Sequence, residues 1–444
     1  MSTGSTAGPR RVLIRDALVL TMDPQLGDRP GCDILVQDGR IAAVGQGLAA
    51  DGAEVIGASG FMAIPGLIDS HTHMWQGPLK GQGAGQWGFA DYQKQVFSLR
   101  GKVGPEDMHD GTFAAGVEML DNGITTALDF CHNVMSPAHA EQALAAHRRT
   151  GQRVVFAYGM LGAQDSLAQD QPWRLEQVRA MHGALQPGLL SMALALGSLE
   201  YTGLQLIANE IELAQELGLV MTFHQNPQGQ IRELAAAGLL RRNMVPVHAN
   251  LCTDEELAQL AAVGACISFT VEGEFGGGRA MDIVGRAHRA GVPPTLGIDI
   301  PSRVPLDLFG QMRLTFHVMR ADEAAAERRV GRWPLVRRPG SPFVQPRHML
   351  EYVTVNAAKA LGMADRIGRI APGLRADIVL LRTGPYGLSV GDPAAHVALQ
   401  SCAADVDTVL VDGVVRKRAG QLLHLDRAEA LAATRRVRER VLTA

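Results

Sequence analysis

The stretch IPGLIDSHTHMWQ, residues Ile64 to Gln76, ends an apolar run in two histidines that are separated by one residue. In an extended strand, side chains at positions i and i+2 point to the same side, so His71 and His73 would aim both imidazoles at one point. Two interpretations compete at this stage: polar residues satisfied by local hydrogen bonds, or metal ligands. A catalytic zinc usually has three protein ligands and an open position, so the second interpretation requires further ligands elsewhere in the chain.

Apolar segments that alternate with helical ones indicate the architecture around this stretch. Alternation of strands and helices is typical of βα units and a parallel sheet. With the opening stretch counted as the first strand, eight units over about 300 residues predict a (β/α)8 barrel, whose active sites lie at the C-terminal strand ends. An open doubly wound sheet is the alternative, but no GxGxxG follows the first strand. The seven later strands are expected at 124–130, 153–160, 190–197, 219–225, 244–250, 265–271 and 293–299.

The two ends of the chain are rich in strand signals. Asp38-Gly39 and Asp412-Gly413 each lie between apolar runs, and both are strong signals for a two-residue hairpin. We expect the two ends to meet in one small β-sandwich that is discontinuous in sequence. The fold class is therefore α/β, a distorted barrel plus this sandwich. The expected parts are 1–63 and 371–444 for the sandwich, the latter with a terminal helix, and 64–370 for the barrel.

Composition narrows the classes of function. Of 444 residues, 46% are hydrophobic and 20% charged, which suffices for a large domain and a smaller one. A formal net charge of -3 indicates no nucleic-acid partner, and no apolar run of membrane-spanning length is present. The five cysteines show no CxxC and no paired spacing, which predicts a cytoplasmic protein.

The ends of the other predicted strands supply the missing ligand candidates. Strand five ends in His224, strand six in His248 and strand eight in Asp299. Since the strand ends of a barrel converge around one axis, four imidazoles and one carboxylate would meet there. A coincidence of five such residues is a much weaker interpretation than metal binding.

These motifs together resemble the amidohydrolase superfamily. The resemblance rests on PGLIDSHTH, on the histidines of strands five and six, on the strand-eight Asp, and on the stretch from Thr354 to Leu381. Its nearest branch is the single-metal group of cytosine, guanine and S-adenosylhomocysteine deaminases and triazine hydrolases. No Lys occurs from Val103 through Ala358, which excludes the carboxylated strand-four Lys of the two-metal branch.

The resemblance implies a role for each of these side chains. His71, His73, His224 and Asp299 would bind one divalent ion, Zn²⁺ first and Fe²⁺ as the alternative, because the ligand set suits both. Asp299 would act as general base and then acid. His248 would orient the attacking water or polarise the group under attack, with a structural His beside the site as the alternative.

The chain departs from the family pattern after strand five. Many deaminases of this branch carry a proton-shuttling Glu three residues after that His, but here the position is Pro227. Glu272 and Glu274, after strand seven, are the candidate substitutes. We expect them to leave the strand on one side, with a solvated acidic loop as the alternative.

Further polar and aromatic residues near strand ends are candidates for contact with substrate. For Trp75, packing at the rim of the barrel is the competing interpretation. The candidates are Trp75, Gln76, His132, Asn133, Tyr158 and Ser302.

The predicted function is hydrolysis of a small molecule. Hydroxide made available by the metal would attack an sp² carbon, most simply in hydrolytic deamination of a nitrogen heterocycle. The alternatives are cyclic amide or amidine hydrolysis, another reaction at the same centre, or a non-catalytic binding protein on the same barrel. We expect a homodimer or homotetramer, no nucleic-acid partner and no membrane.

Overall fold

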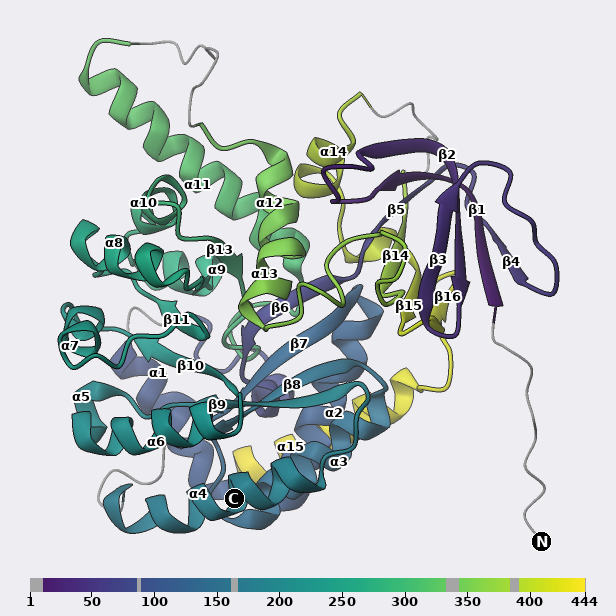
Figure 1. Ribbon diagram of the computed structural model, residues 1–444. Coiled ribbons are helices and arrows are strands. Elements are labelled where there is room, and N and C mark those ends of the chain that lie inside the picture. The colour runs from purple at the N-terminus through teal and green to yellow at the C-terminus, as the bar shows by residue number, and fades with distance from the viewer. Residues whose placement is uncertain (1–10, 86–88, 161–166, 333–342, 384–390, 444) are drawn as a thin grey trace, which may run out of the picture.

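The protein's computed structural model describes residues 11–85, 89–160, 167–332, 343–383 and 391–443. Its centre is an eight-stranded parallel sheet in which strands follow one another in chain order (Figure 1). The predicted barrel is confirmed, with every expected strand present. The barrel strands are β6 (Leu67–Thr72), β7 (Ile124–Cys131), β8 (Arg153–Gly159), β9 (Leu190–Ala195), β10 (Val220–Gln225), β11 (Met244–His248), β12 (Ile267–Phe269) and β13 (Pro294–Leu296).

The barrel closes between its first and last strands at the level of the predicted metal ligands. Thr72 forms a parallel bridge with Asp299. The backbone N–H of Asp299 donates to the His71 carbonyl at 2.8 Å, and that of His73 donates to the Asp299 carbonyl at 2.9 Å. Closure therefore places the carboxylate of the last unit directly beside both histidines of the first.

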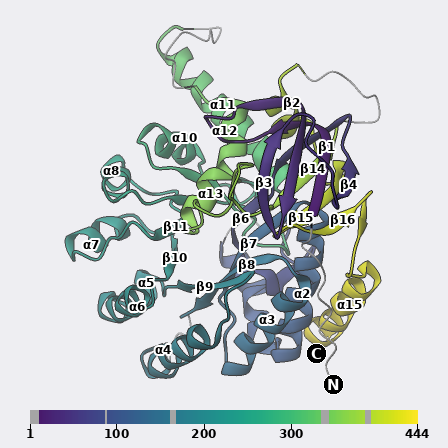
Figure 2. The same ribbon diagram turned by 45° about the vertical axis from the view of Figure 1, so that its right-hand side comes forward.

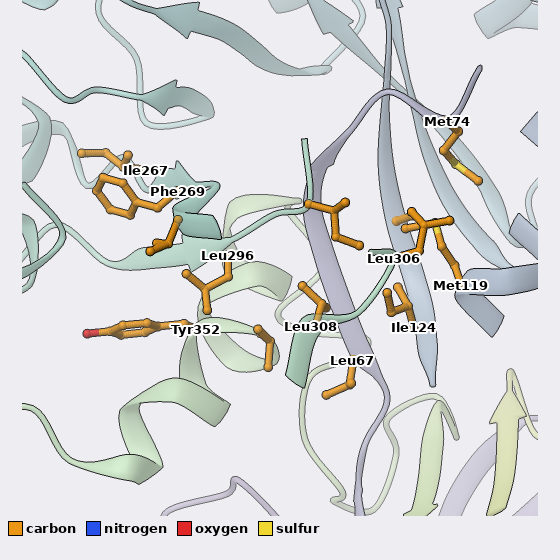
Figure 3. Close-up of a cluster of buried hydrophobic side chains, with 14 of the residues drawn as sticks. Leu67, Met74, Met119, Ile124, Ile267, Phe269, Leu296, Leu306, Leu308 and Tyr352 are labelled. Atoms are coloured by element: carbon orange, nitrogen blue, oxygen red, sulfur yellow. The ribbon is translucent and has the colours of Figure 1, made fainter. Parts of the chain in front are cut away.

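Burial on both faces explains why the barrel strands read as continuous apolar runs. All residues of β6, β7, β8 and β11 are buried. Figure 3 shows one part of this core, where Leu67, Ile124 and Leu296 of three strands lie near Leu308 and Tyr352 from later segments. Packing of this kind fixes the strand ends on which the site stands.

Helices surround the barrel, and Figure 1 shows them following the strands in turn. Signals for the start of a helix are visible in the chain: Thr253 accepts from the Glu256 N–H and Glu256 reaches back to the Thr253 N–H, a capping box. The barrel helices are η1 (Met74–Leu79), α1 (Phe89–Gln95), η2 (Phe97–Lys102), α2 (Pro105–Asp121), α3 (Pro137–Thr150), α4 (Leu167–Ala184), α5 (Leu199–Thr202), α6 (Leu204–Glu216), α7 (Gln230–Ala236), α8 (Asp254–Val263), α9 (Val271–Gly276), α10 (Asp282–Arg289), α11 (Leu308–Arg329), α12 (Pro346–Tyr352) and α13 (Val355–Ala360).

The two chain ends form a second, nine-stranded sheet, in agreement with the predicted discontinuous domain. Strands from both ends line its apolar core, and β5 pairs with β14. Its strands are β1 (Arg11–Leu20), β2 (Asp28–Gln37), β3 (Arg40–Gly45), β4 (Glu54–Gly57), β5 (Phe61–Pro65), β14 (Ile378–Arg382), β15 (Val406–Val411), β16 (Val414–Arg418) and β17 (Gln421–Leu422).

The chain passes from the second sheet into the barrel at Pro65-Gly66. Ile64 and Pro65 pair with β14 and belong to the second sheet, so the barrel begins at Leu67. Gly66 lies between the sheets, where a Cβ would lie 2.0 Å from the Thr125 hydroxyl oxygen. A residue with a side chain would not fit beside Thr125, so this crossing between the sheets requires glycine.

Both predicted hairpin turns are present. Asp38, Gly39, Asp412 and Gly413 all have positive φ, as a type I′ turn requires. The two turns also meet, because a Cβ on Gly413 would lie 2.7 Å from the Gly39 Cα.

The last helices lie outside the barrel ring. They are α14 (Pro393–Leu399), η4 (Ala403–Asp405) and α15 (Arg427–Thr443). Figure 2 shows α15 beside α2, where Arg440 donates to Asp107 and Arg436 to Asp110. Across the residues described, no helix has the length and apolar character needed to cross a membrane.

Candidate active site

Four side chains converge at the C-terminal end of the barrel. The ligand atoms of His71, His73, His224 and Asp299 all lie within 4.8 Å of one another. The Nε2 atoms of His71 and His73 lie 3.3 and 3.2 Å from the same Asp299 oxygen, Oδ1. The structure thus brings together all four residues that the sequence suggested as ligands.

Hydrogen bonding shows that these residues fit a metal ion. Nδ1 of His73 lies 2.8 Å from the Phe130 carbonyl, to which it can only donate, so its Nε2 lone pair faces Asp299. Among the described residues no hydrogen bond reaches either ring nitrogen of His71, although both are buried. An unsatisfied buried polar group costs about 1–3 kcal/mol, which a metal ligand avoids. Three imidazoles and a carboxylate are a donor set that suits zinc.

Burial shapes the charge of the cluster. It lowers the pKa of His71 to about 4 and that of His224 well below the ordinary value, so both imidazoles are neutral and can offer lone pairs. Burial alone would raise the pKa of Asp299, but the close approach of the imidazoles of His71, His73 and His248 holds it well below the usual range. The carboxylate is therefore ionised.

His248 stands beside the four ligand candidates. Its Nε2 lies 4.0 Å from Oδ2 of Asp299, whereas the Nε2 atoms of His71 and His73 lie closest to Oδ1. Nδ1 of His248 lies 3.1 Å from Glu274 Oε1. His248 and Asp299 both have positive φ, 72° and 68°, a backbone conformation that residues other than glycine adopt rarely.

The acidic pair after strand seven does not leave on one side. The segment from Val271 is helical, so Glu272 and Glu274 diverge. Glu274 is buried against His248, whereas the Glu272 carboxylate lies beside Gly310 and its backbone N–H donates to Gln311. The structure does not bring Glu272 to the cluster.

Two of the predicted substrate residues, His132 and Trp75, pack beside the ligand candidates. The His132 ring stacks on His73 with centroids 3.8 Å apart. Trp75 donates from Nε1 to His132 Nδ1 at 3.1 Å and is 1% exposed, so it lies behind His132. Burial lowers the pKa of His132 well below its usual value, which keeps the ring neutral.

A second group of candidates is joined by hydrogen bonds. Gln76 Nε2 donates to the Tyr92 hydroxyl at 2.7 Å, and Ser302 donates to Gln76 Oε1 at 3.4 Å. Asn133 Oδ1 accepts from Arg100 Nε at 3.2 Å.

Tyr158 is occupied elsewhere: its hydroxyl donates to Gln177 Oε1 at 2.6 Å. Burial raises its pKa and keeps the phenol protonated.

Sequence reasoning missed Arg100 and Asn250. Arg100 is buried, donates to the His132 carbonyl and lies over the Phe97 ring, and burial lowers its pKa to about 10. No local pattern marks a buried arginine of this kind. Asn250 donates to Glu274 and follows His248 by two residues, the same spacing that separates His71 from His73, so that signal was available.

The fold and the site together define a metal-dependent hydrolase of the barrel class. The sequence model described as the Amidohydrolase family matches residues 62–416, and the chain belongs to this family. The predicted resemblance and the predicted hydrolase class are confirmed.

Curated relatives and solved structures match over nearly the whole chain. A 5-methylthioadenosine/S-adenosylhomocysteine deaminase of Desulforudis audaxviator is 27% identical, covering 97% of this chain and 99% of its own. A mutant atrazine chlorohydrolase of Arthrobacter aurescens TC1, complexed with zinc and atraton, has a TM-score of 0.82 at 21% identity and covers 96% and 99%. An adenosine deaminase of Xanthomonas campestris with bound zinc has a TM-score of 0.82 at 21% identity and covers 98% and 99%.

Proposed function

We propose that this enzyme removes an amino group hydrolytically from a ring carbon of a nitrogen heterocycle, with one divalent ion at the site. The observation that carries the proposal is the convergence of His71, His73, His224 and Asp299 within 4.8 Å, with His248 beside them. A divalent ion in such a site lowers the pKa of a water ligand to about 7, which makes hydroxide available at neutral pH.

The protein's own groups would then manage orientation and protons. Asp299, ionised and next to two imidazoles, takes the proton of the attacking water and delivers it to the departing nitrogen. His248, with Nε2 on the Asp299 Oδ2 side, orients the attacking water. Removal of one such stabilising group costs about 10²–10³-fold in kcat.

The names of the relatives support the substrate class. The Desulforudis relative is by its name a deaminase of 5-methylthioadenosine and S-adenosylhomocysteine, and the match covers 97% of this chain. We propose zinc as the ion because two structural neighbours contain it. The expected homodimer or homotetramer and the cytoplasmic location stay predictions.

A second candidate function rests on one position. Pro227 stands three residues after His224, and its carbonyl accepts from Gln225 Nε2 at 2.7 Å. Proline has no proton to give to a ring nitrogen. Hydrolysis of a cyclic amide or amidine, or displacement of another leaving group, would need no such donor from this position.

The first test measures metal content and product together. Zinc-loaded protein is expected to hold one equivalent by elemental analysis and to release ammonia from a member of an aminated-heterocycle panel. His71→Ala should lose both the metal and the activity, because water at the open coordination position of the ion cannot replace a missing protein ligand. His317→Ala, which changes an exposed histidine on α11, is the matched control and should keep both.

Each outcome distinguishes between the candidates. If the enzyme hydrolyses cyclic amides and releases no ammonia from the aminated-heterocycle panel, the second candidate function, ring-opening hydrolysis, is the correct one. Full metal content without turnover of either class, together with ligand binding that survives chelation, would select the non-catalytic alternative. Two equivalents of metal would contradict the single-ion site.

A further inference from the structure

Glu274 on α9 faces away from the four ligand candidates yet holds the residue beside them. Its Oε1 atom lies 3.1 Å from His248 Nδ1 and accepts from Thr270, from the backbone N–H at 2.9 Å and from the hydroxyl at 2.8 Å. Asn250 donates to its other oxygen, Oε2. Glu274 is 4% exposed, so this carboxylate is both buried and fully engaged.

The hydrogen-bond pattern determines which nitrogen of His248 carries the proton. Burial alone would raise the pKa of Glu274, but the adjacent His248 and the hydrogen bonds that the carboxylate accepts from His248 and Thr270 lower it, so the group is an acceptor only. The Thr270 hydroxyl donates its one proton to Glu274 Oε1. Nδ1 of His248 is therefore the donor, and in the neutral ring Nε2, on the Asp299 side, keeps its lone pair.

Glu274 is itself held by a network that reaches strand five. Arg279 donates to Asn250 Oδ1 at 3.1 Å, which turns the Asn250 amide nitrogen toward Glu274. The same Arg279 nitrogen also donates to Asn226 Oδ1 at 3.3 Å, two residues after His224. The ends of strands five and six are thus joined through Arg279, and Glu274 is anchored to that junction.

We propose that Glu274 is a positioning residue that holds His248 in the Nδ1–H tautomer, with Nε2 turned toward the reacting group. The inference rests on the proposed function, because it assigns a purpose to the orientation of His248. It also gives the acidic residue after strand seven a different task from that of a proton shuttle, since Glu274 acts through the imidazole. The positive φ of His248 adds to the need for such support, because the backbone there is strained.

A Glu274→Gln variant tests this because its amide cannot fit the site in either orientation. With the amide nitrogen at the Oε2 position, it meets the donating Asn250 nitrogen. With the nitrogen at the Oε1 position, it meets the Thr270 N–H and requires His248 Nδ1 to accept, which is the opposite tautomer. The change keeps size and shape, so packing is preserved.

The kinetic arm compares Glu274→Gln with Glu272→Gln, the same change two residues away on α9 and outside the cluster. Loss of a residue that orients an active-site group should lower kcat about 10–100-fold, with KM changed less than about threefold and metal content unchanged. Glu272→Gln should stay within about twofold of the native kcat. Equal kcat for Glu274→Gln and native protein would overturn the proposal.

The spectroscopic arm needs no substrate, so it separates failure of this proposal from failure of the proposed function. Protein labelled with ¹⁵N-histidine and loaded with zinc is examined by long-range ¹H–¹⁵N correlation, and His248→Ala identifies the signal. Native His248 should show the Nδ1–H tautomer, and Glu274→Gln should shift it toward Nε2–H. An Nε2–H tautomer in the native protein would disprove the assignment, whatever the kinetics.

A second variant protects the test if Glu274→Gln does not fold. Asn250→Ala removes the partner of Oε2 but leaves the Oε1 bond to His248. It should keep the Nδ1–H tautomer and lose less in kcat than the roughly 10–100-fold that is expected for Glu274→Gln. A loss of the tautomer in Asn250→Ala would show that the network as a whole, rather than Glu274, determines the state of His248, and would refute the proposal.

Discussion

Two of the functional side chains stand on backbone that costs free energy. His248 and Asp299 both have positive φ, at about 1–3 kcal/mol each for a residue with a side chain. Their neighbours supply the compensation: Asp299 bridges to Thr72, and His248 is held by Glu274. The identity of both residues was predictable from their place at strand ends, but their backbone conformation was not, because it depends on contacts with residues that are distant in sequence.

The absence of a side chain at Gly297 leads to a prediction about metal binding. A Cβ there would lie 2.7 Å from the His71 carbonyl oxygen and 2.9 Å from the His71 Cβ. We expect Gly297→Ala to displace His71 and to lower zinc content below half an equivalent, about a threefold or greater loss of metal affinity. Elemental analysis after dialysis checks this.

The control is Gly183→Ala, on α4, where a Cβ would meet nothing within 4 Å. It should retain the native zinc content. Full zinc occupancy in Gly297→Ala would show that the strand end adjusts without moving the ligand.

At the scale of elements, the strands were predictable because burial on both faces leaves a continuous apolar signal. The segment after β12 was not, since the expected extended residues coil into α9. A helix turns by about 100° per residue, so residues two apart point to nearly opposite sides. Because the segment is helical rather than extended, Glu274 contacts His248 whereas Glu272 lies beside α11. Glu274 is therefore assigned a positioning role, and Glu272 is not a candidate for a substitute proton shuttle.

The contact between α10 and α12 predicts a pH dependence of stability. Burial, with smaller effects of His348 and Arg289, lowers the pKa of His288 to about 4, whereas an unfolded histidine has a pKa of about 6.5. Between these values the unfolded chain binds more protons, so the free energy of unfolding falls as the pH drops. The stabilisation that comes from the neutral, buried His288 is complete above about pH 6.5 and is lost toward about pH 4.

Urea unfolding at about pH 7.5 and about pH 5 measures this effect. His288→Gln cannot titrate, and its stability should fall less between the two pH values than that of the native protein. The metal cluster is the same in both proteins, so its contribution cancels in the comparison. His317→Gln, at an exposed position, should reproduce the native difference, and an unchanged difference in His288→Gln would contradict the assignment.

At the scale of the whole molecule, one buried ion pair joins the barrel to the second sheet. Arg153, which begins β8, donates to both oxygens of Asp377 at 2.7 and 3.0 Å and to Asp412 at 3.1 Å. Arg153 and Asp377 are each 4% exposed. Arg153→Met leaves a buried carboxylate without its cation, so we expect a loss of about 3–5 kcal/mol in the free energy of unfolding.

Denaturant unfolding of zinc-loaded protein checks that loss. Arg179→Met breaks an exposed pair with Glu216 and should leave stability nearly unchanged. A similar result for the two variants would mean that the sheet and the barrel do not depend on Arg153.

The overall organisation was predictable because each part leaves a local signal: hairpin dipeptides at the ends and alternation of strands and helices between them. The contacts between the parts leave none. Arg153 and Asp377 are far apart in sequence, and neither lies in a motif that would indicate its partner. The same applies to Arg279, whose link between strands five and six depends on how two loops meet.

The pairing of β5 with β14 has a consequence for synthesis on the ribosome. The first five strands leave the exit tunnel early, but the edge of β5 that will receive β14 stays open until the barrel sequence has been translated. During that interval the nascent chain presents an unpaired strand edge, a template for pairing with a neighbouring chain. Slow translation of the barrel segment should therefore favour aggregation of the emerging N-terminal strands, and chaperones that cover such edges should raise the yield of folded enzyme.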